Sequence, residues 1–140
     1  DACIDQFGRL DILFDNAGIE GSMKPLIDQS FEEFDRVQKV NLYGCWLGLK
    51  YAAPKIAESG GGSIVMTSSV AGIIGSPGLG PYVASKHGVV GLMKSADQEL
   101  AEIEAGSRSG LGYGIAESNL AHVTQRRNRF GPHGRPERDV

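Results

Sequence analysis

The sequence predicts an α/β fold in which a parallel β-sheet is covered by helices on both faces. Over residues 1–105, helical and strand-like segments alternate in the order helix, strand, helix, strand, helix. The two strand-like segments are short apolar runs, which is typical of strands buried in a parallel sheet. In such folds ligands bind outside the carboxyl ends of the strands. We therefore expect residues 15–18, residues 67–69 and the start of the last helix to meet at one edge.

The first half of this pattern contains two helices and one strand. Residues 2–7 predict the end of a helix closed at Gly8, followed by a buried strand over residues 10–14. Ser30 and Glu33 match a capping box, in which Ser30 accepts from the Glu33 backbone and the Glu33 carboxylate reaches back. A long helix is expected from there to about residue 57, bent or weakened near Pro54.

The second half begins after three consecutive glycines at 60–62, which end the long helix. Residues 63–67 form a β-branched run and predict a second strand, with Ser68 and Ser69 at its carboxyl end. Residues 75–81 are rich in Gly and Pro and predict a mobile loop. Tyr82 opens another helix that is expected to run to about residue 101 or 102.

Composition and charge favour a soluble globular protein with a small, soluble ligand. The chain is 41% hydrophobic and 22% charged, with a net charge of −3, so nothing favours nucleic acid or an anionic membrane as partner. Cys3 and Cys45 lack the spacing of a disulfide framework or a zinc site, which fits a reducing cytoplasm. No apolar run approaches the roughly 20 residues of a membrane span. The chain starts with Asp1 rather than Met, from which we expect a truncated start.

Residues 106–140 differ in kind from residues 1–105. The first 105 residues hold 8 Lys+Arg against 14 Asp+Glu, whereas the last 35 hold 6 Arg, no Lys and 3 Asp+Glu. The apolar residues of this tail follow neither helical nor strand periodicity. We expect an Arg/Gly-rich tail that is disordered or translated in a shifted reading frame. An RNA- or phosphate-binding role for Arg126, Arg127 and Arg129 is the alternative.

Tyr82 and Lys86 are four residues apart and therefore share one helical face. A tyrosine is a poor acid–base catalyst at neutral pH, but a neighbouring ammonium favours the phenolate. The same spacing also occurs by chance on many surface helices. Ser69 lies 13 positions before Tyr82 at the end of a strand, with a Gly/Pro loop between them. That loop could fold the Ser69 hydroxyl back toward the phenol.

The chain resembles the short-chain dehydrogenase/reductase family over roughly residues 1–102. Four motifs carry the resemblance, in order: Asp-Asn-Ala-Gly at 15–18, Asn41 in the following helix, Ser69, and Tyr-Val-Ala-Ser-Lys at 82–86. The family most often has Asn where this chain has Asp15. The resemblance implies a Rossmann-type doubly wound parallel sheet, here partial, with central strands and helices only. It places this partial domain at residues 1–105, before the tail at 106–140.

The resemblance also implies which residues act in catalysis. Asn41, Ser69, Tyr82 and Lys86 would form a catalytic tetrad. Tyr82 would be the general acid or base, Ser69 would hydrogen-bond the carbonyl oxygen, and Lys86 would lower the Tyr82 pKa and hold the nicotinamide ribose. Asn41 would hold a water that relays protons from Lys86. The residues that contact NAD or NADP would be Asn16, Ala17, Gly18, Tyr82 and Lys86; no metal is expected.

Other interpretations of these residues stay open at the level of sequence. Asn41 could be a polar interruption of a helix, Asn16 a turn former, and Ser68 a competitor for the role of Ser69. Cys45 and Trp46 are expected to pack within the long helix. His87 is expected at the surface or an interface, because it points about 100° away from Lys86.

The resemblance implies an NAD(P)-dependent oxidoreductase that interconverts an alcohol and a ketone. It also implies a homo-oligomer when the protein is full length. No TGxxxGxG turn for the pyrophosphate precedes the first strand, so we expect a fragment that binds dinucleotide weakly on its own. The substrate cannot be read from this sequence. The alternative is a catalytically inactive truncated product or a dimerisation partner of the same fold.

Overall fold

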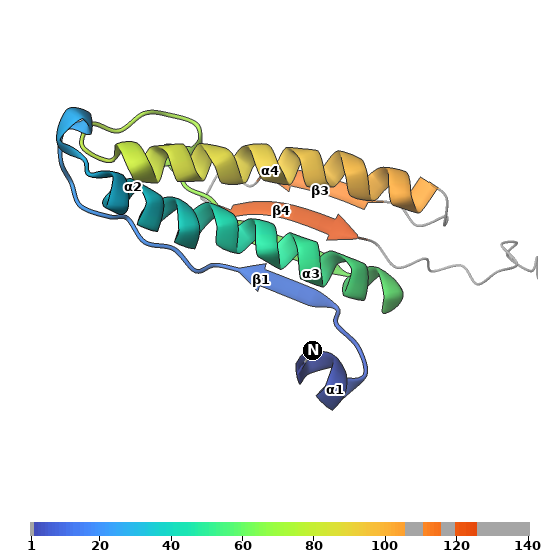
Figure 1. The fold of residues 1–140 in the computed structure, drawn as a ribbon. Helices are drawn as coiled ribbons and strands as arrows, with labels where there is room; N and C mark the ends of the chain where they lie inside the picture. Colours follow the sequence, from blue (N-terminus) through green and yellow to red (C-terminus); the bar gives the residue numbers. More distant parts are fainter. Residues whose placement is uncertain (1, 106–110, 116–119, 126–140) are drawn as a thin grey trace, which may run out of the picture.

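The computed structural model describes residues 2–105, 111–115 and 120–125, with side chains over residues 2–100. The first elements are α1 (Ala2–Phe7), β1 (Ile12–Asp15) and α2 (Phe31–Gln38). A π-helical turn (Lys39–Tyr43) joins α2 to α3 (Gly44–Glu58). The elements that follow are β2 (Ser63–Thr67), α4 (Gly80–Ala105), β3 (Leu111–Ile115) and β4 (Leu120–Gln125) (Figure 1).

The predicted βαβ unit is present. β1 and β2 pair in parallel, with Ile12 opposite Ser63 and Asp15 opposite Met66, and the α2–α3 segment crosses between them. The pairing brings the carboxyl ends of both strands to the same edge of the sheet, as parallel strands require. Residues 15–18 and 67–69 therefore leave the sheet side by side, which confirms the expected convergence.

Within residues 106–140, the structure describes two strands. β3 and β4 form an antiparallel hairpin, and β4 pairs antiparallel with β2, which gives the strand order β1-β2-β4-β3. Pairing with β2 supplies β4 with backbone partners that its irregular sequence pattern does not reveal. The three clustered arginines, like the rest of residues 126–140, lie outside the described residues.

Helices α3 and α4 lie along one face of the sheet (Figure 1). Between these helices and β2 lies the apolar core, whose largest fully buried side chains are Ile56, Met66, Val89 and Met93. Burial of each such side chain stabilises the folded state by about 1.5–3 kcal/mol. This core fixes the positions of α3 and α4 relative to the ends of β1 and β2.

In the described part of the chain, helices α3 and α4 cover one face of the sheet, as in a partial doubly wound fold. In β1, Leu13 points toward α3, whereas Ile12 and Phe14 point the other way and are 65% and 57% exposed. The strand is thus buried on one face only, because no described helix lies on the other. In β2, Ile64 and Met66 are buried, whereas Ser63, Val65 and Thr67 are half-buried.

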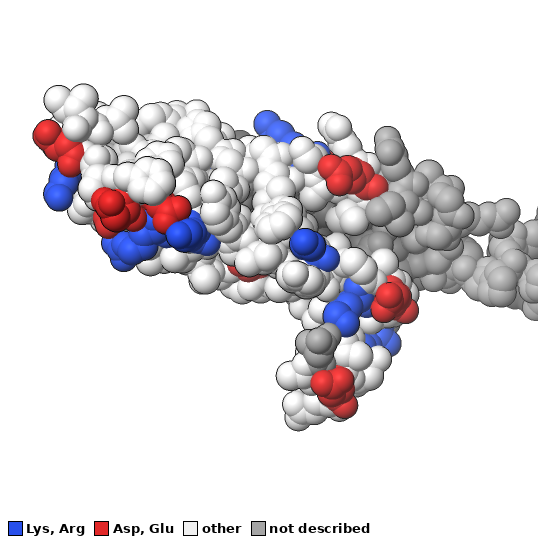
Figure 2. Space-filling model, viewed as in Figure 1, with Lys and Arg blue, Asp and Glu red and all other residues white. Residues whose placement is uncertain are grey.

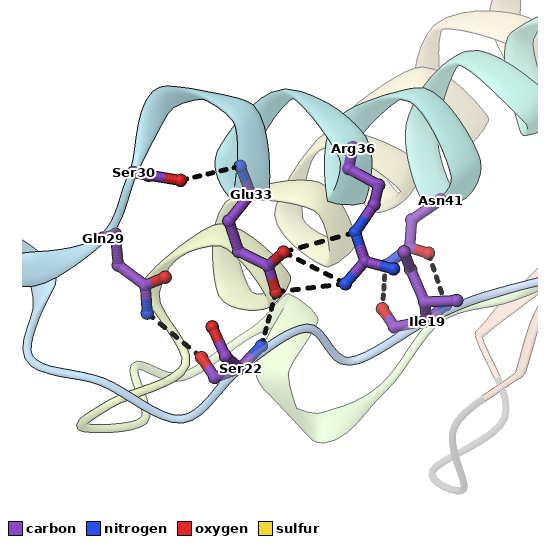
Figure 3. Close-up of polar contacts among 7 residues, drawn as sticks. All are labelled: Ile19, Ser22, Gln29, Ser30, Glu33, Arg36 and Asn41. Atoms are coloured by element: carbon purple, nitrogen blue, oxygen red, sulfur yellow. Dashed lines mark hydrogen bonds and ion pairs between the residues drawn. The ribbon is translucent and has the colours of Figure 1, made fainter.

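The capping of α2 agrees with the sequence in one half only. The Ser30 hydroxyl accepts from the Glu33 backbone N–H at 3.2 Å, as predicted. The Glu33 carboxylate does not return to Ser30; it accepts from the Ser22 backbone N–H at 2.7 Å and pairs with Arg36 (Figure 3). The Glu33 carboxylate thus accepts from the loop at Ser22 instead of from the backbone of its own cap residue, Ser30.

The long helix is present as expected, except for a π-helical turn at its centre. The bounds of the last helix also differ from those expected. The long helix continues through Pro54 to Glu58, but the backbone widens into a π-helical turn around Asn41. Such turns are frequent at functional sites, because the extra residue redirects a side chain. The last helix begins at Gly80, two residues before Tyr82, and reaches Ala105. Within the described residues, no helix has the length and apolarity that crossing a bilayer requires.

Candidate functional site

The site lies where β1 and β2 end. The Thr67 hydroxyl, on the last residue of β2, donates to Asn16 Oδ1 at 2.7 Å. Asn16 follows directly after β1, so this bond ties together the two chain segments that leave the sheet. The Asn16 side chain is exposed, which leaves this edge accessible to a ligand.

Lys86 is the cation at the centre of this edge. Its side chain is only 4% exposed, and its ammonium donates to the Thr67 carbonyl oxygen at 2.7 Å. The same ammonium lies 5.6 Å from the centre of the Tyr82 ring, which confirms that the two residues share a helical face. An ammonium has three hydrogens to donate. Lys86 can therefore bind hydroxyl groups of a ligand while its bond to Thr67 holds it in place.

Asn41 is completely buried in the π-helical turn and makes three hydrogen bonds. Its Oδ1 accepts from the Ile19 backbone N–H at 2.8 Å, and its Nδ2 donates to the Ile19 carbonyl at 2.8 Å (Figure 3). Nδ2 also donates to Ser85 Oγ at 2.9 Å. The interpretation of Asn41 as a casual polar interruption of a helix is therefore wrong, since its amide joins three segments of the chain.

Ser85 belongs to this site, although the sequence analysis gave it no role. It is completely buried, receives the bond from Asn41 and donates to the Tyr82 carbonyl oxygen at 2.7 Å. A path of two hydrogen bonds thus leads from the π-helical turn to the backbone of Tyr82. Its place in the 82–86 motif, three residues after Tyr82, was the signal that could have revealed it.

The two serines after β2 have different environments. Ser68 is 7% exposed and its hydroxyl donates to the Lys86 carbonyl oxygen at 3.3 Å. Ser69 is half-buried, and its Oγ accepts from the Ala71 backbone N–H at 3.2 Å at the start of a short 3₁₀ turn. Among the residues that the structure describes, no hydrogen bond joins Ser69 to Tyr82. Of the two hydroxyls, that of Ser69 is the more accessible to a ligand.

The half-buried Asp15 carboxyl group and the buried Cys45 thiol both lie close enough to Lys86 to affect its pKa. Burial raises the pKa of Asp15, opposed by a hydrogen bond with Cys45 and by the charge of Lys86. Burial, and then the neighbouring Asp15, raise the pKa of Cys45 to about 11. Burial also lowers the pKa of Lys86, opposed by Cys45 and Asp15. The Asp15 Oδ2 atom is buried, and a Cβ at Gly48 would lie 2.5 Å from it.

Gly18 lies next to the two buried polar side chains. A Cβ at this position would lie 3.5 Å from Asn41 Oδ1 and 3.6 Å from Lys86 Nζ, both ordinary van der Waals distances. The exposed backbone at Gly18 is therefore adjacent to the Lys86 ammonium. Asn16, Ala17 and Gly18 are all exposed, which suits a segment along which an extended cofactor lies.

The structure also shows the positions of His87, Cys45 and Trp46, for which expectations came from the sequence. His87 is exposed and its Nδ1 contacts the Val83 carbonyl at 3.0 Å, so it lies on the surface as expected. Cys45 is buried, and Trp46, in the same helix α3, is 47% exposed and packs beside the Lys50 ammonium. The residues that the structure describes contain no group of three His, Cys, Asp or Glu side chains that could bind a metal.

Comparison with known proteins decides the family. Residues 1–106 match the sequence profile of a family described as short chain dehydrogenase. The chain belongs to the short-chain dehydrogenase/reductase family. The match ends where the composition changes to the Arg/Gly-rich tail, in agreement with the extent of the four motifs.

Relatives with curated names support the assignment. The chain is 46% identical over 94 residues to short-chain dehydrogenase reductase 3a of Arabidopsis thaliana, covering 66% of this chain and 37% of that protein. It is 43% identical over 99 residues to cyclohexanol dehydrogenase of Acinetobacter sp. (strain SE19), covering 71% of this chain and 39% of that protein. The chain thus spans less than half the length of these relatives.

Solved structures show the same fold. A NAD⁺-bound xylitol dehydrogenase is 34% identical, with a TM-score of 0.70, over 73% of this chain and 39% of that one. ElxO with NADP bound is 36% identical, with a TM-score of 0.69, over 72% of this chain and 41% of that one. The matched part of the chain therefore has a partial Rossmann-type fold, as the motifs predicted.

Proposed function

We propose that the protein containing this chain interconverts an alcohol and a ketone, with NAD or NADP as hydride carrier. The observation that supports this most is the position of Lys86. Its buried ammonium is held by the Thr67 carbonyl, next to the exposed Gly18 and 5.6 Å from the Tyr82 ring. Family membership and relatives named as dehydrogenases support the same reaction.

In this proposal Tyr82 and Ser69 act on the oxygen atom of the substrate. The Tyr82 phenol gives its proton to the carbonyl oxygen in reduction and takes the proton back from the alcohol in oxidation. The Ser69 hydroxyl donates to the same oxygen and stabilises the negative charge that grows there. The cofactor, when bound, supplies the hydride for reduction and accepts it for oxidation.

Lys86 and Asn41 support the proposed roles of Tyr82 and Ser69. The Lys86 ammonium stabilises the phenolate of Tyr82 by its charge and binds the ribose hydroxyls with its remaining hydrogens. Asn41 fixes the loop at Ile19 and the backbone of α4 through Ser85. It also places a polar amide near Lys86, where a water that relays protons from Lys86 can bind. Asn16, Ala17 and Gly18 line the cofactor beyond the ribose.

Assay of the protein as its gene encodes it tests this proposal. Secondary alcohols with NAD⁺ or NADP⁺, and ketones with the reduced cofactors, are followed by absorbance of the reduced nicotinamide. We expect turnover in the parent and none in Tyr82→Phe. Saturable cofactor binding without turnover for any substrate would instead support the inactive partner of the same fold. Absence of binding to both cofactors would contradict the proposal.

We also propose that the protein is a homo-oligomer that packs through α3 and α4. On the face drawn in Figure 2, closely spaced charges lie over α2, whereas the surface over the middle of α3 and α4 is largely uncharged. Apolar side chains exposed on α3 or just before it include Tyr43, Trp46, Leu47 and Tyr51. An exposed apolar patch of this kind on a soluble protein marks an interface.

The oligomer is tested by sedimentation of the parent and of Leu47→Asp. Leu47 is 43% exposed and lines an apolar hollow with Trp46 and Leu92. We expect a dimer or larger assembly for the parent and a smaller species for Leu47→Asp, because the charge would be buried without a partner. A parent that sediments as a monomer would contradict this proposal.

A further inference from the structure

The start of α4, which carries Tyr82, is held by side chains of the helix that crosses between β1 and β2. Gln38, the last residue of α2, is 8% exposed, and its Nε2 donates to the Pro81 carbonyl oxygen at 2.8 Å. Pro81 lies directly before Tyr82 in the chain. This bond joins residues 43 positions apart, and the shift in α4 that would break it would also move Tyr82.

A second contact holds the carbonyl that follows. Three residues after Gln38, Asn41 donates to Ser85 Oγ, which donates to the Tyr82 carbonyl oxygen. The backbone on both sides of the Tyr82 Cα is thus held from α2 and the π-helical turn, at Pro81 by Gln38 and at Tyr82 by Asn41 through Ser85. Residues three apart on a helix lie on one face, which allows both amides to reach α4.

The loop before α4 is held in the same way but farther from Tyr82. Gln29 Nε2 lies 3.3 Å from the Gly78 carbonyl oxygen and 3.1 Å from those of Ser22 and Lys24. The Lys24 backbone N–H donates to Gly78 at 3.0 Å. These bonds order the loop, but Gln38 is the side chain that contacts the residue adjacent to Tyr82.

We propose that Gln38 is a positioning residue that sets the place of the Tyr82 phenol through its hydrogen bond to the Pro81 carbonyl. The inference rests on the proposed function of Tyr82 as the group that transfers the proton. A catalytic group displaced by about 1 Å can lose about 10²-fold in rate. A buried amide that donates to a buried carbonyl is suited to preventing such a displacement, because its loss leaves that carbonyl without this donor.

Two variants of Gln38 test this in the protein as its gene encodes it. Gln38→Met keeps the length of the side chain but removes the donor, and Gln38→Glu keeps the shape but replaces the amide donor with a carboxylate. We expect kcat per folded molecule to fall about 10-fold or more in Gln38→Met and further in Gln38→Glu, with KM for the cofactor unchanged. Gln6→Met, the same change at an exposed position in α1, is the matched control and should match the parent.

A spectroscopic measurement tests the geometry without turnover. The protein is labelled with 3-fluorotyrosine, and the ¹⁹F signal of Tyr82 is assigned by its loss in Tyr82→Phe. We expect the Tyr82 signal to move or broaden in both Gln38 variants while those of Tyr43 and Tyr51 stay unchanged.

The outcomes separate the inference from the proposed function. A parent without hydride transfer would contradict the proposed function, and the ¹⁹F signal would still decide the role of Gln38. An unchanged Tyr82 signal in Gln38→Met, or a kcat per folded molecule equal to that of the parent, would overturn the inference. Failure of both variants to fold would also overturn it, because Gln38 would then determine the fold rather than position one side chain.

Discussion

Asn41 and Ser85 are joined by a 2.9 Å hydrogen bond that links the π-helical turn to the second turn of α4. Both side chains are completely buried. Because both are polar, the hydrophobic effect does not account for their burial. The bond connects the loop after β1 to the backbone of Tyr82, because Asn41 also holds both polar groups of Ile19. The Asn41 amide thus connects two segments of the proposed site.

We expect Asn41→Leu to destabilise the protein by at least about 2 kcal/mol. The substitution leaves the Ile19 N–H and C=O and the Ser85 hydroxyl without this partner, and each such buried group costs about 1–3 kcal/mol. Urea unfolding followed by circular dichroism measures the change. Lys39→Leu is the matched control in the same turn, since it removes an exposed ion pair with Asp35 that solvent screens strongly. Equal midpoints for the two variants would show that the Asn41 bonds contribute little.

We expect Tyr82→Phe to abolish turnover while leaving cofactor affinity nearly unchanged. The ring remains beside the Lys86 ammonium, 5.6 Å away in the parent, and only the proton donor is lost. Lys86→Ala should damage both turnover and binding, because its ammonium is expected to contact the ribose as well. Steady-state rates from about pH 6 to about pH 9 and cofactor titration by fluorescence provide the measurements. Activity of Tyr82→Phe close to that of the parent anywhere in this range would remove Tyr82 from its role.

The two serines after β2 should respond differently to substitution by alanine. Ser69→Ala is expected to lower kcat by about 10²-fold or more, the scale seen on removal of one donor to a developing oxyanion. Ser68→Ala should affect stability instead, by about 1 kcal/mol, since its hydroxyl donates to the Lys86 carbonyl inside the protein. Each variant is the control for the other in rate assays and urea unfolding. The opposite pattern would mean that Ser68 is the residue that contacts substrate.

The elements predicted correctly depend on signals that are local in the sequence. β2, the Ser30 cap and the shared face of Tyr82 and Lys86 follow from apolar runs, capping residues and a spacing of four. The convergence of residues 15–18 and 67–69 follows from the parallel pairing of two strands. These features need only neighbours within a few residues or one rule of topology.

The features that were missed depend on partners far along the chain. The Glu33 carboxylate binds Ser22 rather than its own cap, and Gln38 reaches Pro81 across 43 positions. The exposure of Phe14 depends on what covers that face of the sheet, which an apolar strand does not reveal. β4 pairs with β2 although its own pattern is irregular. Local periodicity carries no information on such pairings.

The two cysteines should differ strongly in reactivity toward thiol reagents. The thiolate is the reactive form, and burial raises the pKa of Cys45 to about 11, whereas Cys3 is exposed in α1. At about pH 7.5 we expect a disulfide reagent to label Cys3 rapidly and to label Cys45 only when the protein unfolds. Cys3→Ser should abolish the rapid phase and Cys45→Ser should leave it unchanged. A rapid phase that survives Cys3→Ser would show that Cys45 is accessible.

We expect Asp15→Asn to stabilise the protein at neutral pH. Burial raises the pKa of Asp15 above its ordinary value of 3.8, so the folded state holds the proton more tightly than the unfolded state does. The contribution of this carboxyl group to stability is therefore present in full below about pH 3.8 and declines as the pH rises through the folded pKa. Asparagine stays neutral and avoids that decline.

The gain from Asp15→Asn should therefore be largest near pH 7 and shrink as the pH falls toward 4, measured by the midpoint of guanidinium unfolding. Asp5→Asn, at an exposed position in α1, is the matched control and should change the midpoint little at either pH. The amide also tests how much Lys86 and Cys45 depend on the Asp15 charge, since both lie close enough to affect its pKa. A variant less stable than the parent at pH 7 would show that these two interactions outweigh the cost of burying the carboxylate.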